Sequence, residues 1–172
     1  MADQEMQARV RSAVENWVHQ EARLIDDGKL EEWLTLFAPG GIYSLPIDEN
    51  AEPGTVASLI YDDELRRRER VFRLLHTRAH AQDPLSQTMH LVGNVQVEIH
   101  ADESVTAYSN QIIYEIRAGR ADYRQAGLGE QRSFAARCVH RLVGTPGHWT
   151  MALKKMVLLN REIAIENLTF IL

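Results

Sequence analysis

Apolar and polar positions alternate along residues 83–100, DPLSQTMHLVGNVQVEIH, the stretch around which the rest of the chain is arranged. A period of two is typical of a strand with one buried and one wetter face. Asp83-Pro84 marks its start, because the residue before a proline is disfavoured in the helical region. We expect this strand to open a curved sheet whose concave face receives helices. The buried face would carry Leu91, Gly93, Val95, Val97 and Ile99, and the wetter face Val92, Asn94, Gln96, Glu98 and His100.

The residues before this strand show helical spacing of apolar positions. Residues 6–25 predict a long amphipathic helix that ends near Gly28, and residues 30–37 a second, short one stopped by Pro39-Gly40-Gly41. A short strand at 42–45 and a surface loop at 46–58 follow. Residues 62–76 predict a third helix capped by Asp62, with these apolar side chains inward: Leu65, Val71, Phe72 and Leu75.

After residue 100 the pattern is that of strands. Residues 105–117 predict a second long strand with a bulge, 118–131 a loop, 133–142 a third strand and 149–159 a fourth, with turns at 101–104 and 144–147. The tail ENLTFIL is apolar, so we expect it to pack against the sheet or against another subunit. Helices followed by an antiparallel meander predict an α+β fold.

Composition narrows the class of protein. With 172 residues, 45% apolar and 25% charged, the chain is expected to form one domain, 1–172, of an ordinary globular protein. The net charge of −5 argues against nucleic-acid binding. The single cysteine, Cys138, excludes an internal disulfide and a cysteine-only metal cluster. We find no secretory leader and no membrane-spanning apolar run, and expect a cytoplasmic protein.

Three segments together resemble a known family: ARLIDDGKLEEWLTLFAPGGIYSLP at 22–46, DPLSQTMHLVGNVQV at 83–97 and WTMALKKMVLLN at 149–160. They are similar to the small (β) subunits of aromatic-ring-hydroxylating dioxygenases. Tyr61-Asp62-Asp63, followed by the helix with RVFRL at 70–74, fits the same family.

The resemblance implies an NTF2-like (cystatin-like) cone, with N-terminal helices packed on a strongly curved, mainly antiparallel sheet. It also implies a homotrimer of small subunits within an α3β3 assembly, as the base under the catalytic α subunits. The Rieske 2Fe-2S cluster and the mononuclear iron would belong to the α subunit, with no cofactor in this chain. A Rieske centre needs two cysteines and two histidines, and this chain has one cysteine. It also lacks a phosphate-binding loop, a nucleophile elbow and a dinucleotide fingerprint.

Two groups of polar residues have competing interpretations. His76, His80 and Asp83 are the residue types that hold non-haem iron, but Pro84 indicates that the helix has ended, and capping and surface hydrogen bonds are the favoured interpretation. His90 and Asn94 either satisfy groups inside the sheet, which we favour over chemistry, or contact another subunit.

The main alternative is a self-sufficient isomerase or dehydratase on the same fold, and a further one is a small-ligand-binding or scaffold protein. An isomerase needs an acid–base residue in an apolar pocket with a tyrosine donor. Asp26 and Asp27 precede a helix-ending glycine, where we expect exposure. The other residues that matter for this alternative are Tyr43, Tyr61 and, as cavity or core aromatics, Trp17, Trp33 and Trp149.

Charged residues indicate candidate ion pairs and subunit contacts. Lys154-Lys155 interrupts the fourth strand, so one lysine faces the less polar side and needs a partner such as Glu98, Asp102 or a carboxylate of another subunit. The third helix carries five arginines, which suit either solvent or an acidic partner. The candidate subunit-interface residues are Arg66, Arg70, Arg73, His90, Asn94, Lys155 and Phe170.

Overall fold

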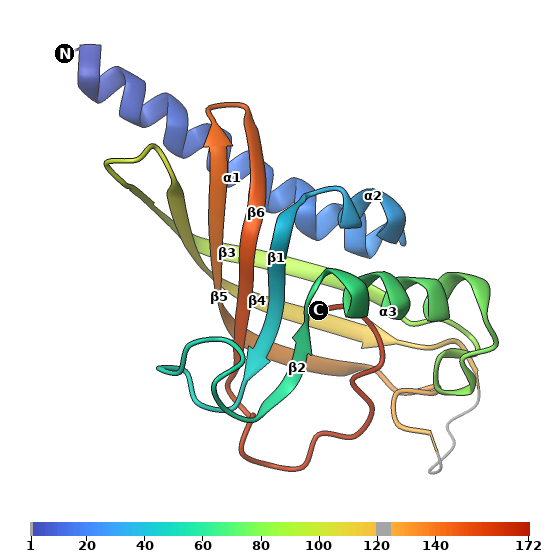
Figure 1. Cartoon of the computed structure of the whole chain (residues 1–172). Coiled ribbons are helices and arrows are strands. Elements are labelled where there is room, and N and C mark those ends of the chain that lie inside the picture. Colours follow the sequence, from blue (N-terminus) through green and yellow to red (C-terminus); the bar gives the residue numbers. More distant parts are fainter. Residues whose placement is uncertain (1, 120–124) are drawn as a thin grey trace.

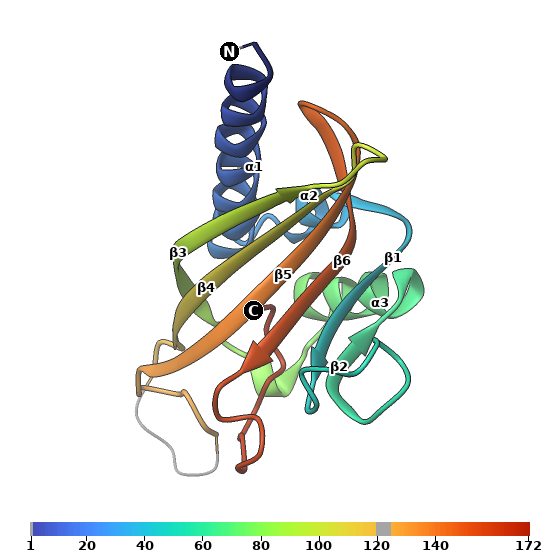
Figure 2. The same ribbon diagram turned by 90° about the vertical axis from the view of Figure 1, so that its left-hand side faces the viewer.

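One six-stranded sheet, with all the helices on one of its faces, makes up the chain (Figures 1 and 2). The structure is a computed structural model and describes residues 2–119 and 125–172, so residues 120–124 of the predicted loop lie outside it. The elements in chain order are α1 (Ala2–Asp26), α2 (Leu30–Leu34), β1 (Phe37–Pro46), β2 (Ser58–Asp62), α3 (Glu64–His76), a 3-10 turn (His80–Gln82), β3 (Gln87–Ile99), β4 (Val105–Ile116), β5 (Arg132–Thr145) and β6 (His148–Leu158).

The sheet has the order β2-β1-β6-β5-β4-β3. The strands β3 to β6 form the predicted antiparallel meander, with long ladders between each neighbouring pair. The strand β1 joins this meander in parallel with β6 and antiparallel with β2, so the sheet is mixed and open at both edges. The predicted α+β architecture with helices on a curved, mainly antiparallel sheet is confirmed.

The helices close over the concave face at two places. The long helix α1 runs across β3, while α3 lies against β1 and β2 (Figure 2). Gly28 ends the first helix as predicted, because its positive φ of 69° allows backbone hydrogen bonds from Gly28 and Lys29 back to the last turn. The chain therefore forms a cone whose wall is the sheet and whose cover is helical.

The predicted faces of two elements were wrong. In β3 the register shifts between Gly93 and Gln96, and Asn94 adopts a φ of 52°. A bulge of this kind inserts an extra residue and reverses which side chains face inward. Before the bulge the side that was expected to be buried is exposed, including Leu91, and His90 of the supposed wetter face points inward.

The third helix is rotated relative to the prediction. Its buried residues are Arg67, Val71 and Leu74, whereas the expected core residues Leu65 and Phe72 are exposed. Burial of Arg67 explains the rotation, because its guanidinium lies 3.8 Å from the centroid of a phenyl ring and donates to main-chain oxygens. The cap is Asp63 instead of Asp62, and it accepts a hydrogen bond from the backbone N–H of Arg66.

Two boundaries near the first strand also differ. The strand β1 begins at Phe37 and continues through the Pro39-Gly40-Gly41 segment that was expected to separate helix from strand. Position 41 needs a glycine, because a Cβ atom there would clash with the carbonyl oxygen of Met151 on β6 at 2.5 Å. The hairpin partner β2 was not predicted, since Ser58–Asp62 is short and has no clear alternation.

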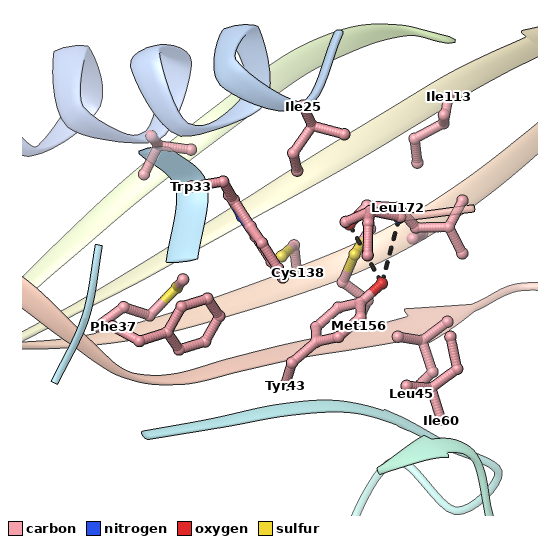
Figure 3. Packing of buried hydrophobic residues seen from close by; sticks show 14 of the residues in the cluster. Ile25, Trp33, Phe37, Tyr43, Leu45, Ile60, Ile113, Cys138, Met156 and Leu172 are labelled. Carbon is pink, nitrogen blue, oxygen red and sulfur yellow. Dashed lines mark hydrogen bonds between the residues drawn. The ribbon is translucent and has the colours of Figure 1, made fainter. Parts of the chain in front are cut away.

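The C-terminal tail fills the middle of the cone (Figure 3). Phe170, Ile171 and Leu172 are all buried and belong to the same core as Tyr43 and Trp33. The hydroxyl of Tyr43 donates to the carbonyl oxygen of Leu172 at 3.3 Å and accepts from its backbone N–H at 3.2 Å. Of the two places expected for the tail, the structure shows the one against the sheet.

Candidate functional site

The interior of the cone contains a buried cluster of polar side chains. Glu21 of α1 accepts hydrogen bonds from the ammonium of Lys154 and from the indole N–H of Trp33, both at 2.7 Å. The other carboxylate oxygen of Glu21 lies 3.6 Å from Nε2 of His140 on β5, whose ring is 3.8 Å from the sulfur of Cys138. Glu21, Lys154 and His140 have no solvent exposure.

The charges in this cluster stabilise one another. Burial alone raises the pKa of Glu21, but Lys154 and His140 outweigh it and hold that pKa well below its usual range. Burial lowers the pKa of His140, but contacts with Cys138 and Glu21 outweigh it and raise the pKa to about 9. Lys154 thus pairs with Glu21 and not with the expected Glu98, Asp102 or another subunit.

A second polar group joins the end of α1 to β3. Asp26 accepts hydrogen bonds from the Thr88 hydroxyl at 2.8 Å, the backbone N–H of His90 at 2.8 Å and Nδ1 of His90 at 2.6 Å. Burial raises the pKa of Asp26, and its bonds with His90 and Thr88 outweigh this and lower it. The expectation of an exposed Asp26 was wrong, since its side chain is 22% exposed and that of His90 is fully buried; Asp27 is exposed as expected.

The arrangement of Asp26 and His90 is that of a carboxylate orienting an imidazole, as in acid–base sites. Nε2 of His90 is buried and has no hydrogen-bond partner among the described residues. A cavity at Thr88, whose lining includes Ile25 and Phe170 but not His90, has a volume of about 70 Å³. That is far below the volume of roughly 300 to 1,000 Å³ typical of small-molecule sites.

The aromatic residues named for the enzyme alternative line no such cavity. Trp33 packs edge-on against Phe37 and Tyr43, and Trp17 against the ring of His140. Burial raises the pKa of Tyr43 above its usual range, which keeps the hydroxyl protonated while it bonds to the tail. Trp149 is buried as well, whereas Tyr61 is partly exposed beside Gly54 of the loop. Trp33, Tyr43 and Trp149 therefore fill the core.

His76, His80 and Asp83, considered as metal ligands and favoured for capping and surface hydrogen bonds, form no metal site among the described residues. The described part of the chain contains no group of three or more His, Cys, Asp or Glu side chains that could hold a metal ion. His76, at the last turn of α3, instead contacts a carboxylate oxygen of Glu31 on α2 at 3.0 Å. A Rieske centre does not fit this chain either, because its single thiol, Cys138, lacks the second cysteine that such a centre needs.

The candidate interface residues differ in whether their side chains are exposed or engaged inside the chain. Three contact other residues inside the chain. Arg70 forms a bidentate ion pair with Asp62, His90 is hydrogen-bonded to Asp26, and Phe170 packs in the core against Phe134. Arg66, Arg73 and Asn94 are exposed, and the ammonium of Lys155 donates to the carbonyl oxygen of Glu49 at 3.1 Å. The exposed residues keep their status as predicted contacts.

Large apolar side chains are exposed on the outer face of the sheet, which sequence patterns did not indicate. Leu91 of β3 stands opposite Ile112 of β4, and both are more than 40% exposed. Their neighbours along the same face and at its edge include further exposed apolar residues. This outer-sheet patch consists of Met89, Leu91, Ile112 and Ile116.

The fold is shared by solved structures of known class. An NTF2-like protein with a cystatin-like fold from Novosphingobium aromaticivorans superposes with a TM-score of 0.60 at 16% identity, over 92% of this chain and 88% of that one. A structure of naphthalene 1,2-dioxygenase with indole in the active site gives a TM-score of 0.76 at 17% identity, over 96% of this chain and 86% of that chain. The NTF2-like architecture is therefore established.

Sequence comparison identifies the family. Residues 20–164 match the family described as the ring hydroxylating beta subunit, and the chain belongs to that family. The small oxygenase component of the p-cumate 2,3-dioxygenase system of Pseudomonas putida is 36% identical over 115 residues. That match covers 65% of this chain and 64% of the relative, so the chain spans less than two thirds of that relative's length. The β subunit of benzoate 1,2-dioxygenase from Burkholderia mallei gives a TM-score of 0.69 at 21% identity, over 92% of this chain and 95% of that one.

No helix in the parts of the chain that the structure describes has the length and apolar character needed to cross a membrane.

Proposed function

We propose that this chain is the non-catalytic, structural β subunit of a multicomponent aromatic-ring-hydroxylating dioxygenase that works in the cytoplasm in the breakdown of aromatic compounds. Three copies form a base that supports three α subunits. The α subunits carry the Rieske 2Fe-2S cluster and the mononuclear iron, and neither nucleic acid nor membrane is a partner.

The observation that carries this proposal is the filled interior of the cone. An enzyme on this fold needs an enclosed space with an acid–base group and room for substrate. Here the tail residues Phe170 to Leu172 are part of the core, and Leu172 bonds to Tyr43, one of the two tyrosines named for the enzyme alternative. Glu21, His140 and Lys154 satisfy one another's charge instead of facing a cavity.

The outer-sheet patch supports self-association. Covering a side chain such as Leu91, half exposed on the outer face of the sheet beside other apolar residues, with a second protein is favourable because apolar surface leaves water. The patch includes Met89 and Leu91 of β3, which is an edge strand with one side unpaired in the sheet order. Contacts between copies in a trimer would cover both features.

The enzyme alternative has one observation in its favour, the pairing of Asp26 with His90 and the unpartnered Nε2 of that histidine. The cavity of about 70 Å³ beside Thr88 is too small for a ring substrate. We therefore assign Asp26 to anchoring α1 on β3.

Affinity purification of the chain from its native cells tests the proposal. We expect a larger chain with a Rieske cluster to co-elute in equal amount, with iron in the eluate that follows the larger chain. A chain that elutes alone and turns over enones or hydroxylated ring compounds would overturn the proposal in favour of an isomerase or dehydratase.

A further inference from the structure

A pocket at the C-terminal end of α3 is lined by basic side chains. It has a volume of about 290 Å³ and lies between the last turns of α3, the 3-10 turn and the tail. Arg70, Arg73, Arg78 and His80 all contribute to its wall, and none of its described lining residues is acidic. Such a concentration of positive charge is notable on a chain whose net charge is −5.

Two of these arginines, Arg73 and Arg78, have no counter-charge within the described part of the chain. Arg70 is neutralised by Asp62, with Nε to Oδ2 at 2.5 Å and Nη2 to Oδ1 at 3.0 Å. Arg73 and Arg78 take part in none of the ion pairs formed among the described residues. The pocket therefore keeps a positive charge that an anion can satisfy.

Hydrogen bonds hold the back wall of the pocket in place. The amide of Gln82, which is buried, donates to the hydroxyl of Thr169 at 3.0 Å, and the amide of Asn167 donates to the carbonyl oxygen of Ala81 at 3.2 Å. The guanidinium of Arg117 donates to the same carbonyl at 2.9 Å. A wall that is ordered before binding loses little conformational entropy when a ligand arrives.

The exposed face of α3 beside the pocket carries two apolar side chains among charged ones, Arg68 and Glu69 included. Leu65 and Phe72 are separated by seven residues, so they lie on one helical face, and they are 66% and 58% exposed. Arg66 and Arg73 have the same separation and run beside them. Exposed apolar side chains next to unpaired charges can be covered by a partner protein, whereas a free small anion would leave Phe72 exposed.

We infer that the face of α3 with Leu65 and Phe72, together with the basic pocket of Arg73 and Arg78, docks an acidic segment of a partner protein that carries an apolar side chain next to a carboxylate. The carboxylate enters the pocket, where arginine can bind it through two parallel hydrogen bonds. The apolar side chain covers Phe72. This inference rests on the proposed function, which makes the α subunit the partner.

The test uses purified α subunit as the probe, with the β chain immobilised and binding measured at two salt concentrations. The variant R73E/R78E reverses both unpaired charges, and R11E/R23E makes the same charge change at exposed positions of α1. We expect roughly tenfold weaker binding for the first variant and less than twofold change for the second. The variant R73K/R78K keeps the charge but cannot form two parallel hydrogen bonds, so we expect its affinity to fall between that of wild type and that of R73E/R78E. F72S weakens binding without altering its salt dependence.

Thermal unfolding checks that each variant is folded. The four replaced arginines are exposed, so we expect their replacement to leave the core intact. Wild-type affinity falls with added salt more steeply than that of R73E/R78E, because exposed charge pairs are screened. Equal affinities for wild type and R73E/R78E would overturn the inference and leave the proposed function standing. Failure of wild type itself to bind the α subunit would instead contradict the proposed function.

Discussion

Glu21 on α1 and Lys154 on β6 form an ion pair of 2.7 Å, 133 residues apart in sequence, with both side chains completely buried. The pair joins the helical cover of the cone to its wall. Because both partners are completely buried, the stability of the chain depends on the charge balance of this interior.

Removal of one partner should be severe. Lys154→Met keeps much of the side-chain volume but leaves the Glu21 carboxylate without its counter-charge, and we expect a loss of about 3–5 kcal/mol in the free energy of unfolding. Urea denaturation measures this. Lys155→Met is the matched control, since its ammonium donates to one main-chain oxygen at a partly exposed site, and should cost about 1 kcal/mol.

The double variant Glu21→Gln/Lys154→Met separates charge from shape. Its amide oxygen can still accept the bond from Trp33, both charges of the pair are gone, and His140 can become neutral by losing its proton. We expect it to recover most of the stability lost in Lys154→Met. A double variant as unstable as the single one would contradict the ion-pair account.

Stability should fall on the alkaline side through His140. Its folded pKa of about 9 is raised above the ordinary value of 6.5, so its contribution is fully present below pH 6.5 and is lost as the pH rises through about 9. The pKa of Glu21 is lowered from 4.5, so its contribution is present above that value and decreases as the pH falls below it. Unfolding free energies measured between pH 6 and 10, for wild type and His140→Gln, test the histidine. A slope of equal size in both proteins would assign the loss to other groups.

The tail should behave as part of the core. Phe170→Ala removes a ring that is 4% exposed and packs on Phe134, and we expect a loss of about 3–5 kcal/mol. Ile163→Ala, at a residue 67% exposed, should change stability by less than about 0.5 kcal/mol. Calorimetry on both variants measures the change in the free energy of unfolding. A small loss for Phe170→Ala would mean that the tail does not pack as part of the core.

Self-association should depend on the outer-sheet patch. Leu91→Glu places a charge on a residue that is half exposed, so the fold tolerates it while an apolar contact between copies does not. We expect the isolated chain to change from a trimer to a 19.6 kDa monomer in analytical ultracentrifugation. Ile163→Glu is the control and should remain trimeric. A trimeric Leu91→Glu variant would place the contact elsewhere.

Much of the architecture follows from local sequence patterns. The period of 3.6 along α1, the glycine after it and the period of two in β5 correctly predicted a helix, its end and a strand, because each pattern depends on neighbours within a few residues. The face of β3 could not be read in the same way. One inserted residue at Asn94 reverses the alternation, and the sequence NV at 94–95 resembles an ordinary continuation of the strand.

The sequence indicated only some of the buried charged residues. Lys154 was noticed because it breaks the alternation of β6, but its partner Glu21 resembles one more polar residue of a solvated helix. A signal did exist: Glu21 falls at helical spacing from Val14, Val18 and Ile25, on the face that turned out to be core. Arg67 was hidden for a similar reason, because an arginine in a basic run suggests solvent until Phe37 is seen beneath it.

The most direct test of the central claim is native mass spectrometry of the chain purified together with its α subunit, combined with aromatic-oxidation assays of the complex and of each chain alone. The account predicts an assembly of three small and three large subunits, oxidation by the complex, and no turnover of any aromatic compound by the small chain alone. A small chain that turns over substrate by itself, or that never appears in a complex with a Rieske subunit, would contradict it.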